Sequence, residues 1–504
     1  MKNGLKNQND METSALINMP KSELFTDYFF KENTFDEVFK TNSPANGYYN
    51  RLLSLITSYS AEEFIILNEY AKKSFVSRGV TFATYSDNPK GNERIFPFDL
   101  FPRIIPQTEW DVLEKGLKQR NRAINLFIHD LYHDSKILKD KVVPVDLILS
   151  CSNFNRYMKN FTPPGGVYNH ISGTDIIKHN DGNYYVLEDN VRCPSGVSYV
   201  LANREAMKKT ISSVFSNFNI FPVSDYPEAL QELMHSVKCD KIDNPTCVVL
   251  TPGAYNSAYY EHSFLAQSMG IELVEGRDLF AENDFIYKRT VYGAKRVDVI
   301  YRRVDDDFID PLVFRPDSVL GVPGLMSAYR KGNVSIINAP GTGVADDKAV
   351  YAYIPEIVKY YLNEEPILKN VPTYRCDVKQ EMDYVLKHIG ELVVKPVDQS
   401  GGYGIFIGNQ ATKAEIEEQK KIITANPRGY IAQPTMSLSV HSTFIDGQNK
   451  FEPRHIDLRT YTLLGPDKEF VLKGGLSRVA LKKGSLIVNS SQGGGSKDTW
   501  VMEE

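Results

Sequence analysis

The sequence predicts an α/β protein that also contains antiparallel α+β elements, and three observations support this class. First, a buried-type strand at 247–250 is followed by a glycine-containing loop, a helical stretch at 259–269 and an apolar strand at 271–274, the order of a βαβ unit. Second, apolar residues recur at helical spacing through 345–362. Third, a short apolar segment at 391–396 leads into a glycine-rich turn and another apolar segment, the pattern of a hairpin.

The bulk composition is that of a soluble globular protein. A chain of 504 residues is long enough for roughly three domains. Hydrophobic residues make up 42% and charged residues 24% of the chain, which are ordinary proportions. The net charge is −5 and no long basic run occurs, so we expect no nucleic-acid partner.

The cysteines and the apolar runs favour a cytoplasmic protein. The five cysteines show no CxxC spacing, which is typical of reduced thiols and not of a disulfide framework or a zinc site. The first fourteen residues are polar and lack the apolar core of a signal peptide. No apolar run approaches the length of a membrane span, so we expect no membrane partner.

The first part of the chain is predicted to be mainly helical. Residues 1–45 are polar and rich in asparagine, which indicates a mobile arm with one or two short helices around 21–40. Apolar spacing through 48–77 predicts two helices. Thr108 is in position to cap a further helix that extends to Leu131.

Two histidines within that last helix resemble a zinc-protease motif. His129 and His133 are four residues apart, as in HExxH, but Asp130 stands where the motif needs glutamate. Aspartate is one methylene too short for that role, and no third ligand is evident downstream. Solvated or capping histidines are therefore the preferred interpretation.

The stretch 184–198 is the main candidate for a functional site. Its apolar strand is followed by Glu188, Asp189, Asn190 and Arg192, and strand geometry places Glu188, Asn190 and Arg192 on one face and Asp189 on the other. A carboxylate, an amide oxygen and a guanidinium on one face suit a hard cation and the phosphate that it holds. The alternative is a strand that ends in an ordinary polar turn.

A hairpin is predicted to bring a second carboxylate to this face. The turn at 180–183 separates the strand before it, which carries Asp175, from the strand that carries Glu188. The register of such a hairpin can slip, so their pairing is a hypothesis.

Charged residues in the second half of the chain each have two interpretations. Arg302 and Arg303 precede an aspartate run and are most simply part of a solvated loop, although a substrate role remains open. Lys348 falls in the first turn of the helix at 345–362, which Asp346 or Asp347 can cap. The helix dipole disfavours a lysine there unless a phosphate binds nearby, so a phosphate contact and a solvated lysine are both possible.

A strand-ending lysine and a glycine-rich turn form a second candidate site. Lys395 ends the strand 391–396, and Ser400, Gly401, Gly402 and Gly404 follow it. Backbone N–H groups of such a turn can cradle a polyphosphate while the lysine neutralises its charge. No GK[ST] and no helix follow, so this is not a Walker A loop, and a simple turn remains the alternative.

Four further segments complete the chain. A strand is expected at 430–433 and a longer one at 451–463, which carries Asp457 and Arg459. Residues 471–480 are predicted to form a hairpin with Arg478 on its return strand. The polar Gly/Ser segment that begins at 489 is either a tail or an ordered loop.

Taken together, these motifs resemble the circularly permuted ATP-grasp type 2 family, similar to glutathionylspermidine synthetase. The segments that carry the resemblance are LEDNxRxPSGVSY, GVADDKAVYAYIP, VVKPxxxSGGYGI, EPRHIDLRTY and NSSQGGGSKDTW, and they span about residues 75–500. Glu188 and Asn190 precede Lys395 by some two hundred residues, the reverse of the order in ordinary ATP-grasp proteins. Gly173 stands where glutathionylspermidine synthetases carry arginine, and we expect no amidase domain, so the substrates of those enzymes are not carried over.

The resemblance implies a role for each candidate residue. Mg²⁺ would be held by Asp175, Glu188 and Asn190 and would bridge the phosphates of ATP. Arg192 would stabilise the transferring phosphoryl group, with Arg459 and Arg478 as further contacts. The remaining residues would bind ATP: Lys348, Lys395, Ser400, Gly401, Gly402, Gly404 and Gln433. The two lysines would contact the phosphates, and Gln433 would lie beside the adenine.

The resemblance also implies a domain division and a function. Residues 1–75 would be an N-terminal helical extension, 76–240 the part with the metal site, 241–340 an inserted pre-ATP-grasp α/β domain, and 341–504 the part with the nucleotide-binding lysine. The implied reaction is the ATP- and Mg²⁺-dependent joining of a carboxylate to an amine through an acyl phosphate. The amine would belong to an amino acid, a peptide or a polyamine. The alternatives are a phosphotransferase on the same fold and a nucleotide-binding assembly protein without turnover.

Overall fold

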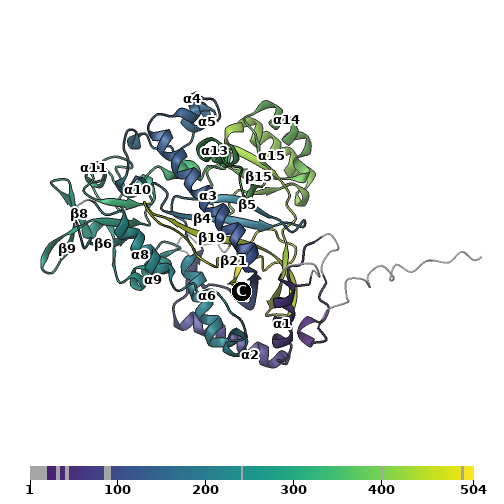
Figure 1. Ribbon diagram of the computed structural model, residues 1–504. Coiled ribbons are helices and arrows are strands. Elements are labelled where there is room, and N and C mark those ends of the chain that lie inside the picture. Colours follow the sequence, from purple (N-terminus) through teal and green to yellow (C-terminus); the bar gives the residue numbers. More distant parts are fainter. Residues whose placement is uncertain are drawn as a thin grey trace, which may run out of the picture.

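A large mixed sheet forms the centre of the protein (Figure 1). The computed structural model describes residues 20–29, 34–39, 45–84, 92–239, 242–399, 401–489 and 493–503. Seven strands follow one another across the sheet in the order β13-β5-β4-β19-β21-β22-β3, and β18 and β20 also pair with β19. The strands are β3 (Phe98–Ile105), β4 (Ile171–Lys178), β5 (Tyr184–Asn190), β13 (Lys369–Asn370), β18 (Val440–Ile445), β19 (Lys450–Leu464), β20 (Glu469–Val471), β21 (Leu476–Val479) and β22 (Gly495–Val501).

This sheet unites segments that are far apart in the chain. The antiparallel hairpin β4–β5 comes from the predicted segment 76–240, whereas its neighbour β19 comes from 341–504. The two predicted segments therefore share one layer. The expected pairing of the hairpin is confirmed, because Asp175 pairs with Glu188.

A long helix covers one face of the central sheet. Helix α3 (Gln107–Tyr132) crosses β4, β5 and β19 in Figure 1, and its apolar side chains, including Trp110 and Leu113, are buried. The helix begins directly after Pro106, whose backbone is extended, so Thr108 lies inside its first turn. The prediction that Thr108 caps this helix was wrong.

A four-stranded parallel sheet lies beside the central one. Its order β12-β11-β6-β7 confirms the predicted βαβ unit, in which α9 (Tyr259–Met269) connects β6 to β7. A small antiparallel sheet, β10-β9-β8, projects from this unit at the left of Figure 1. The other elements are β6 (Cys247–Leu250), β7 (Glu272–Val274), β8 (Leu279–Glu282), β9 (Phe285–Thr290), β10 (Gly293–Val297), β11 (Val299–Arg302), β12 (Ser335–Ile337), α8 (Tyr226–Ser236), α10 (Asp306–Ile309) and α11 (Leu325–Arg330).

A third sheet has the order β14-β17-β15-β16 and carries the glycine-rich turn between β15 and β16. The helix predicted at 345–362 is instead two helices, α12 and α13, and Asp347 caps the first by accepting from Ala349 and Val350 N–H. The elements are β14 (Tyr374–Arg375), β15 (Leu392–Pro396), β16 (Phe406–Ile407), β17 (Tyr430–Pro434), α12 (Lys348–Tyr351), α13 (Ile354–Leu362), α14 (Lys379–His388) and α15 (Lys413–Ala425).

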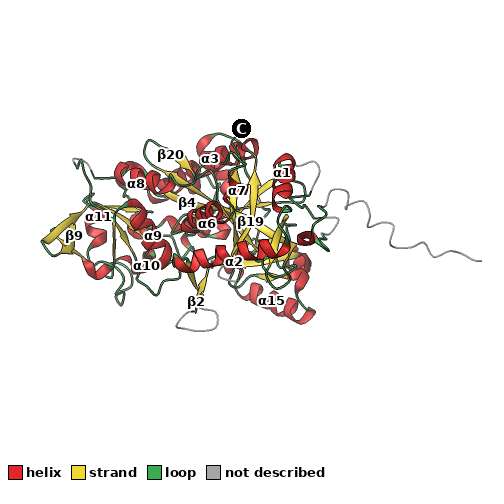
Figure 2. Ribbon diagram, turned by 90° about the horizontal axis from the view of Figure 1, so that it is seen from below, coloured by secondary structure: helices red, strands yellow, loops and turns green. Residues whose placement is uncertain are grey.

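The N-terminal helices pack against the central part of the molecule, as the view from below shows (Figure 2). The two helices predicted at 48–77 are confirmed as α1 (Asn46–Ile56) and α2 (Ala61–Ser77), and α2 contacts α6 (Val197–Thr210). Within 21–40, the described residues form one 3₁₀ turn at Glu23–Phe25, and the rest of the expected arm largely lies outside the described residues. Smaller elements are β1 (Thr81–Thr84), β2 (Asn92–Ile95), α4 (Lys136–Lys139), α5 (Val145–Leu149) and α7 (Ser212–Phe215).

The C-terminal strands differ from the prediction. Residues 471–480 do not form a hairpin, because β20 and β21 are successive partners of the same strand, β19. Gly475 lies in the interruption between them, where a Cβ atom would come within 2.7 Å of Arg459 O. The Gly/Ser segment is partly a strand, since β22 lies between β21 and β3.

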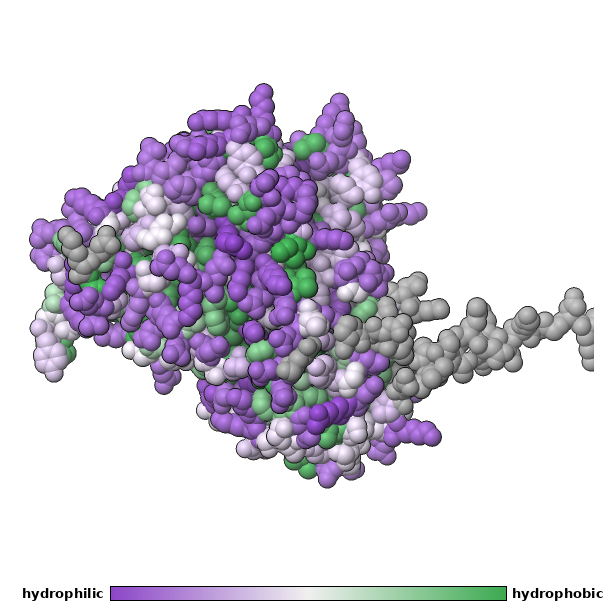
Figure 3. All heavy atoms as spheres, in the orientation of Figure 1, coloured by the Kyte–Doolittle hydropathy of each residue, from purple (hydrophilic) through white to green (hydrophobic). Residues whose placement is uncertain are grey.

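The surface in Figure 3 is mostly hydrophilic, with small scattered apolar areas. Among the helices of the described residues, none combines the length and the apolar character that a membrane crossing requires.

Candidate active site

Two adjoining cavities open at the edge where the three sheets meet. The larger has a volume of about 520 Å³ and the smaller about 110 Å³. Both are lined by Glu188 from β5, Lys348 from α12 and Tyr403 from the glycine-rich turn. The three segments singled out in the sequence therefore meet at one place.

Asp175 is the most tightly held residue of this site. It is buried, and its Oδ1 accepts from Arg459 Nε at 2.6 Å. Its Oδ2 accepts from Arg459 Nη2 and from Arg478 Nη2, both at 2.8 Å. Burial by itself would raise the pKa of Asp175, but the guanidinium groups of Arg459 and Arg478 hold it well below its usual range. Asp175 is therefore a permanent anion.

Arg478 is shared between two aspartates. It donates from Nε to Asp457 Oδ1 at 2.8 Å, in addition to its bonds to Asp175. Burial raises the pKa of Asp457, which Arg478 partly offsets. The predicted group Asp457, Arg459 and Arg478 is thus assembled around the Asp175 carboxylate.

Glu188 is much less well satisfied than Asp175. Its nearest cations are Lys348 Nζ, 3.5 Å from Oε2, and Arg459 Nη2, 3.9 Å from Oε1. These distances are longer than a charge-assisted hydrogen bond. Asn190 lies on the same strand, and its side-chain nitrogen donates to Gly173 O at 3.2 Å.

The residues present fit a divalent cation by the chemistry of their donors. Asp175 and Glu188 are direct neighbours in the register, and Asn190 adds an amide group two residues along the same strand. The Glu188 carboxyl group lies within hydrogen-bond reach of Asp175, and its nearest cationic nitrogens are 3.5 and 3.9 Å away. Carboxylate and amide oxygens of this kind are the ligands that Mg²⁺ prefers.

Two lysines face these carboxylates. Lys348 Nζ approaches Glu188 and also donates to Gln399 O at 2.5 Å, which ties α12 to the start of the glycine-rich turn. Lys395 is buried, and burial lowers its pKa to about 8 despite the neighbouring Glu188. The interpretation of Lys348 as a simple solvated lysine does not hold, because its side chain is 12% exposed.

The glycine-rich turn closes over the smaller cavity. Gly401, Gly402 and Gly404 all have positive φ angles, between 70° and 81°, which residues with a Cβ rarely adopt. Gly401 and Gly402 line the smaller cavity, whereas the predicted contact of Ser400 lies outside the described residues.

The walls of the smaller cavity are mainly apolar. Gln433 lines it from β17 and donates from its side-chain nitrogen to Thr373 Oγ1 at 3.0 Å. The aliphatic lining includes Val393, Ile407, Met436, Leu438 and Leu486. An apolar slot that ends at two lysines and a carboxylate pair has the layout to hold a planar base at one end and phosphates at the other.

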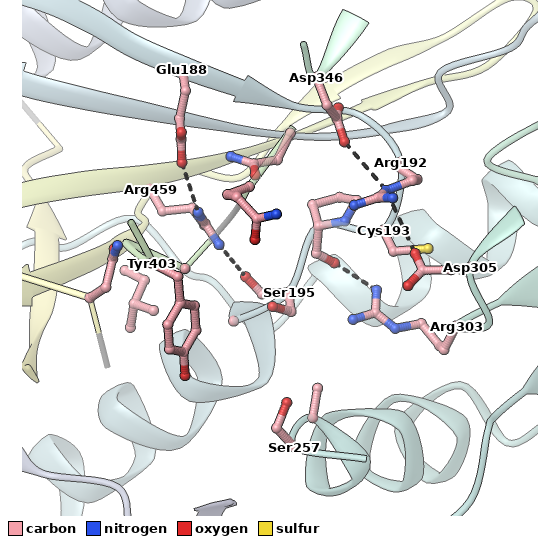
Figure 4. Close-up of a pocket in the computed structure, with 18 of the residues that line it drawn as sticks. Glu188, Arg192, Cys193, Ser195, Ser257, Arg303, Asp305, Asp346, Tyr403 and Arg459 are labelled. Carbon is pink, nitrogen blue, oxygen red and sulfur yellow. Dashed lines mark hydrogen bonds and ion pairs between the residues drawn. The ribbon is translucent and has the colours of Figure 1, made fainter. Parts of the chain in front are cut away.

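Arg192 lies on another side of the larger cavity, apart from Glu188 (Figure 4). Its Nε is 3.6 Å from Asp305 Oδ1 and 3.7 Å from Asp346 Oδ2. Asp346 also accepts from Val191 N–H at 2.6 Å, which fixes the turn after β5. Burial raises the pKa of Asp346 to about 7, although Arg192 acts in the opposite direction.

The surroundings of Gly173 explain why this position does not hold the arginine that glutathionylspermidine synthetases resembling this chain carry there. A Cβ at Gly173 would lie 2.9 Å from Pro194 Cβ and 3.7 Å from Arg459 Cδ. A larger side chain therefore does not fit, and Arg459 already brings a guanidinium to Asp175.

The parallel-sheet unit contributes residues near the larger cavity that were predicted to be solvated or were not singled out from the sequence. Arg302 and Arg303 are buried, and Arg303 lines the larger cavity. The solvated-loop interpretation was therefore wrong for both arginines. Their position at the end of strand β11 was the available signal, since ligands bind beyond the carboxyl ends of parallel strands. Glu261 and His262, in α9, gave no such signal.

His129 and His133 belong to neither cavity. Their rings stack at 4.2 Å, and His133 Nε2 lies 3.1 Å from Thr162 Oγ1. Among the described residues, no group of three histidine, cysteine, aspartate or glutamate side chains is placed to hold a metal ion. The zinc-protease alternative finds no support here.

Comparison with known proteins identifies the family. The family described as circularly permuted ATP-grasp type 2 matches residues 102–480. An uncharacterized protein of Synechocystis sp. is 51% identical over 94% of this chain and 97% of its own length. An uncharacterized protein of Mycobacterium tuberculosis is 47% identical over 93% of this chain and 84% of its own length.

Two further similarities concern named proteins. A Frankia casuarinae protein named "Putative glutamate--cysteine ligase 2-2" is 41% identical over 84% of this chain but only 48% of its own length. The apo structure of a glutathione synthetase-like effector, GSS30 of Globodera pallida, has a TM-score of 0.58 and 11% identity, and covers 88% of this chain and 98% of its own. The latter likeness concerns the fold alone.

The fold and the family match define an α/β protein of the ATP-grasp type. The chain belongs to the circularly permuted ATP-grasp type 2 family, which confirms the resemblance seen in its motifs.

Proposed function

We propose that this protein is an ATP- and Mg²⁺-dependent ligase that joins a carboxylate to an amine through an acyl phosphate. The observation that carries the proposal is the meeting of Asp175 and Glu188 with Lys348 and Lys395 where the two cavities join. The smaller cavity would take the adenine base, and the phosphates would lie where it meets the larger cavity, which is big enough for two further small substrates. Family membership and the ligase name of the Frankia relative support this class of reaction.

In the first step, a carboxylate oxygen attacks the γ-phosphorus of ATP. The bond between that phosphorus and the bridging oxygen breaks, and ADP leaves with the electron pair. Negative charge spread over the transferring group makes positioning and electrostatics the main catalytic contributions. Lys348 and Lys395 would hold the phosphates, while Tyr403 and the glycine-rich turn would exclude water.

Mg²⁺ would be held by Asp175, Glu188 and Asn190. When bound, it neutralises phosphate charge and orients the nucleotide. Arg459 and Arg478 would keep the Asp175 carboxylate ionised and correctly oriented, since three of their N–H groups donate to it.

In the second step, the amine nitrogen attacks the acyl carbon. The bond from carbon to the phosphate oxygen breaks, inorganic phosphate leaves with the electron pair, and the nitrogen loses a proton. Arg192, which lines the larger cavity, would stabilise the acyl phosphate. The net products are an amide, ADP and phosphate.

Product analysis tests this proposal. The purified protein is incubated with ATP, Mg²⁺ and paired carboxylates and amines, and ADP, phosphate and organic products are measured by mass spectrometry. A ligase yields ADP, phosphate and an amide in equal amounts. A phosphorylated organic product without an amide would indicate a phosphotransferase, and ATP binding without turnover under any mixture would indicate an assembly protein.

A further inference from the structure

The wall of the larger cavity that belongs to the parallel-sheet unit carries hydrogen-bond donors without a role in the proposed phosphoryl transfer. Helix α9, eleven residues long, begins at this wall, where Asn256, Ser257 and Ala258 line the cavity. The N-cap residue, Ala258, offers no side-chain cap, although Asn256 Oδ1 accepts from its backbone N–H at 2.9 Å. The positive end of the helix dipole therefore faces the cavity.

Arg303 provides an independent second observation. Its side chain is only 3% exposed, and it lines the same wall. Nη1 donates to Pro194 O at 2.6 Å and to Tyr301 Oη at 3.0 Å, and Nη2 donates to Glu261 Oε1 at 3.1 Å. Nε is buried and has no acceptor among the described residues. Nε has no accessible surface, so a ligand in the cavity does not contact it directly, and Arg303 acts on a ligand through the positive charge that it places at this wall.

His262 presents another donor at this wall. Its Nδ1 lies 2.9 Å from Thr251 Oγ1, which itself accepts from Gly253 N–H at 3.2 Å. Thr251 is buried and has no other acceptor within the described part of the chain, so its hydroxyl donates to Nδ1. The ring proton is then on Nε2, for which the described residues offer no partner. Burial, together with Arg303, lowers the pKa of His262 to about 2, so the ring stays neutral.

The buried acidic residue at this wall, Glu261, is already engaged. Glu261 Oε2 accepts from Gly196 N–H at 2.7 Å and from the backbone and hydroxyl of Ser198 at 3.1 Å, and its other oxygen accepts from Arg303. Asp305 lies 3.6 Å from Arg192 Nε and is 52% exposed, so solvent screens its charge. The N-terminus of α9 and His262 are therefore the donors left for a ligand.

We propose that these groups, the α9 N-terminus at 256–258 with His262 and Arg303, form a carboxylate subsite that binds the amine substrate of the ligase. The inference rests on the proposed function and narrows it: the acceptor is an amino acid or a peptide with a free carboxylate. Ser257 and Arg303 lie on the side of the cavity away from Glu188 and Asp346 (Figure 4). An acceptor held there by its carboxylate directs its amine toward the phosphoryl-transfer end.

A polyamine is disfavoured by the same geometry. It carries only positive charges, which would face the positive end of α9 with no carboxylate to accept from the α9 N–H groups and from His262. Like charges of this kind exclude an unwanted ligand as effectively as good contacts select the right one.

The experiment compares acceptors under conditions in which acyl-phosphate formation is measured separately. Wild-type protein, ATP, Mg²⁺ and a panel of the twenty L-amino acids as carboxylate donors are first incubated with hydroxylamine, which traps an acyl phosphate as a hydroxamate without using the subsite. Each active donor is then paired with glycine, glycylglycine, glycinamide or spermidine. Glycine or glycylglycine is expected to give amide about ten- to a hundredfold more efficiently than glycinamide or spermidine, because a charge-assisted contact is lost.

Two variants locate the effect. In Arg303→Gln, the KM of the preferred acceptor is expected to rise about ten- to a hundredfold. If this buried change prevents folding, His262→Phe is used, and the same rise in KM is expected. The ratio of hydroxamate to amide product rises with it. Arg277→Gln is the matched control, because Arg277 is 78% exposed and lines neither cavity.

Each outcome decides the matter. Equal use of glycinamide or spermidine together with normal hydroxamate formation would overturn the subsite and leave the ligase proposal intact. An unchanged acceptor KM in both variants would do the same. Absence of hydroxamate with every carboxylate would contradict the ligase proposal itself, and the subsite with it.

Discussion

Glu188 and Asp189 are neighbours on one strand, yet their carboxylates differ in burial and in the hydrogen bonds that they accept. Asp189 faces helix α3 and accepts from Arg120 Nε at 2.8 Å and from Arg120 Nη2 at 2.6 Å. Glu188 faces the cavities, and its nearest cations are 3.5 and 3.9 Å away. Asp189 is 3% exposed, whereas the Glu188 side chain is 19% exposed.

From this difference we infer a structural role for Asp189 and a functional role for Glu188. Asp189 is paired with Arg120 on the α3 side of β5, so its role is to join β5 to α3. Asp175 is paired as tightly with Arg459 and Arg478, but these arginines line the larger cavity beside Glu188. The nearest cations of Glu188 are too distant for close hydrogen bonds, so its carboxylate can still bind a ligand. The comparison predicts that changes at Asp189 affect folding, while changes at Glu188 affect catalysis.

The largest expected effect on stability is at Asp189. Replacing it with alanine leaves the Arg120 guanidinium buried without its carboxylate, which typically lowers the free energy of unfolding by about 3–5 kcal/mol. Urea denaturation followed by circular dichroism measures this loss. A free energy of unfolding within error of the wild type would show that the Asp189–Arg120 pair does not hold the hairpin to α3.

A smaller effect is expected on the cavity face of the hairpin, at Gly173. An alanine Cβ would approach Pro194 Cβ at 2.9 Å, so Gly173→Ala displaces the loop that follows β5. Such overpacking costs about 1–3 kcal/mol of stability, less than the loss at Asp189. Turnover is expected to fall together with stability, because Arg459 also packs there. Steady-state kinetics and a denaturation curve of the same variant measure both effects. Unchanged turnover and unchanged stability would contradict the close packing of this face.

A still smaller effect concerns the proton on Lys395. Burial lowers its pKa to about 8, whereas an unfolded lysine titrates near 10.4. Between these values the unfolded chain binds more protons, so this group makes the free energy of unfolding rise as pH increases from about 8 to 10. Bound phosphates favour the charged form and raise the pKa again.

Nucleotide binding at pH 8.5 should therefore take up roughly three-quarters of a proton at Lys395. Calorimetric titration of ADP in two buffers of different ionisation enthalpy measures this number. The variant Lys395→Arg keeps its charge throughout this range and serves as the control, with no uptake expected. Equal heats in both buffers for the wild type would place Lys395 away from the phosphates.

Local signals in the sequence predict the carboxylate hairpin but not its register. The turn at 180–183 and the two-residue repeat place Glu188 and Asp189 on opposite faces, but regular pairing from Ile176 with Val186 would continue to Asp175 with Leu187. The observed pair of Asp175 with Glu188 depends on the irregularity between Asp175 and Ile176. The strand that ends in Lys395 and its glycine-rich turn were likewise readable, because the glycines mark positive φ angles.

Contacts between distant segments could not be predicted in this way. The bonds from Arg459 and Arg478 to Asp175 span about three hundred residues, and the closure of the sheet by β22 depends on partners at both ends of the chain. The role of Arg303 depends on Glu261 and Pro194, which approach it only through tertiary packing. Charge runs in a sequence do not show which members are buried.

The most direct test of the account is the ATP turnover of Glu188→Gln, measured beside Asp189→Asn at a temperature where both are folded. We predict that Glu188→Gln retains its free energy of unfolding but loses Mg²⁺-dependent ADP release almost completely, by roughly 10²–10³-fold. Asp189→Asn should show the reverse, with turnover retained and stability reduced. Unchanged turnover in Glu188→Gln would contradict the assignment of this site.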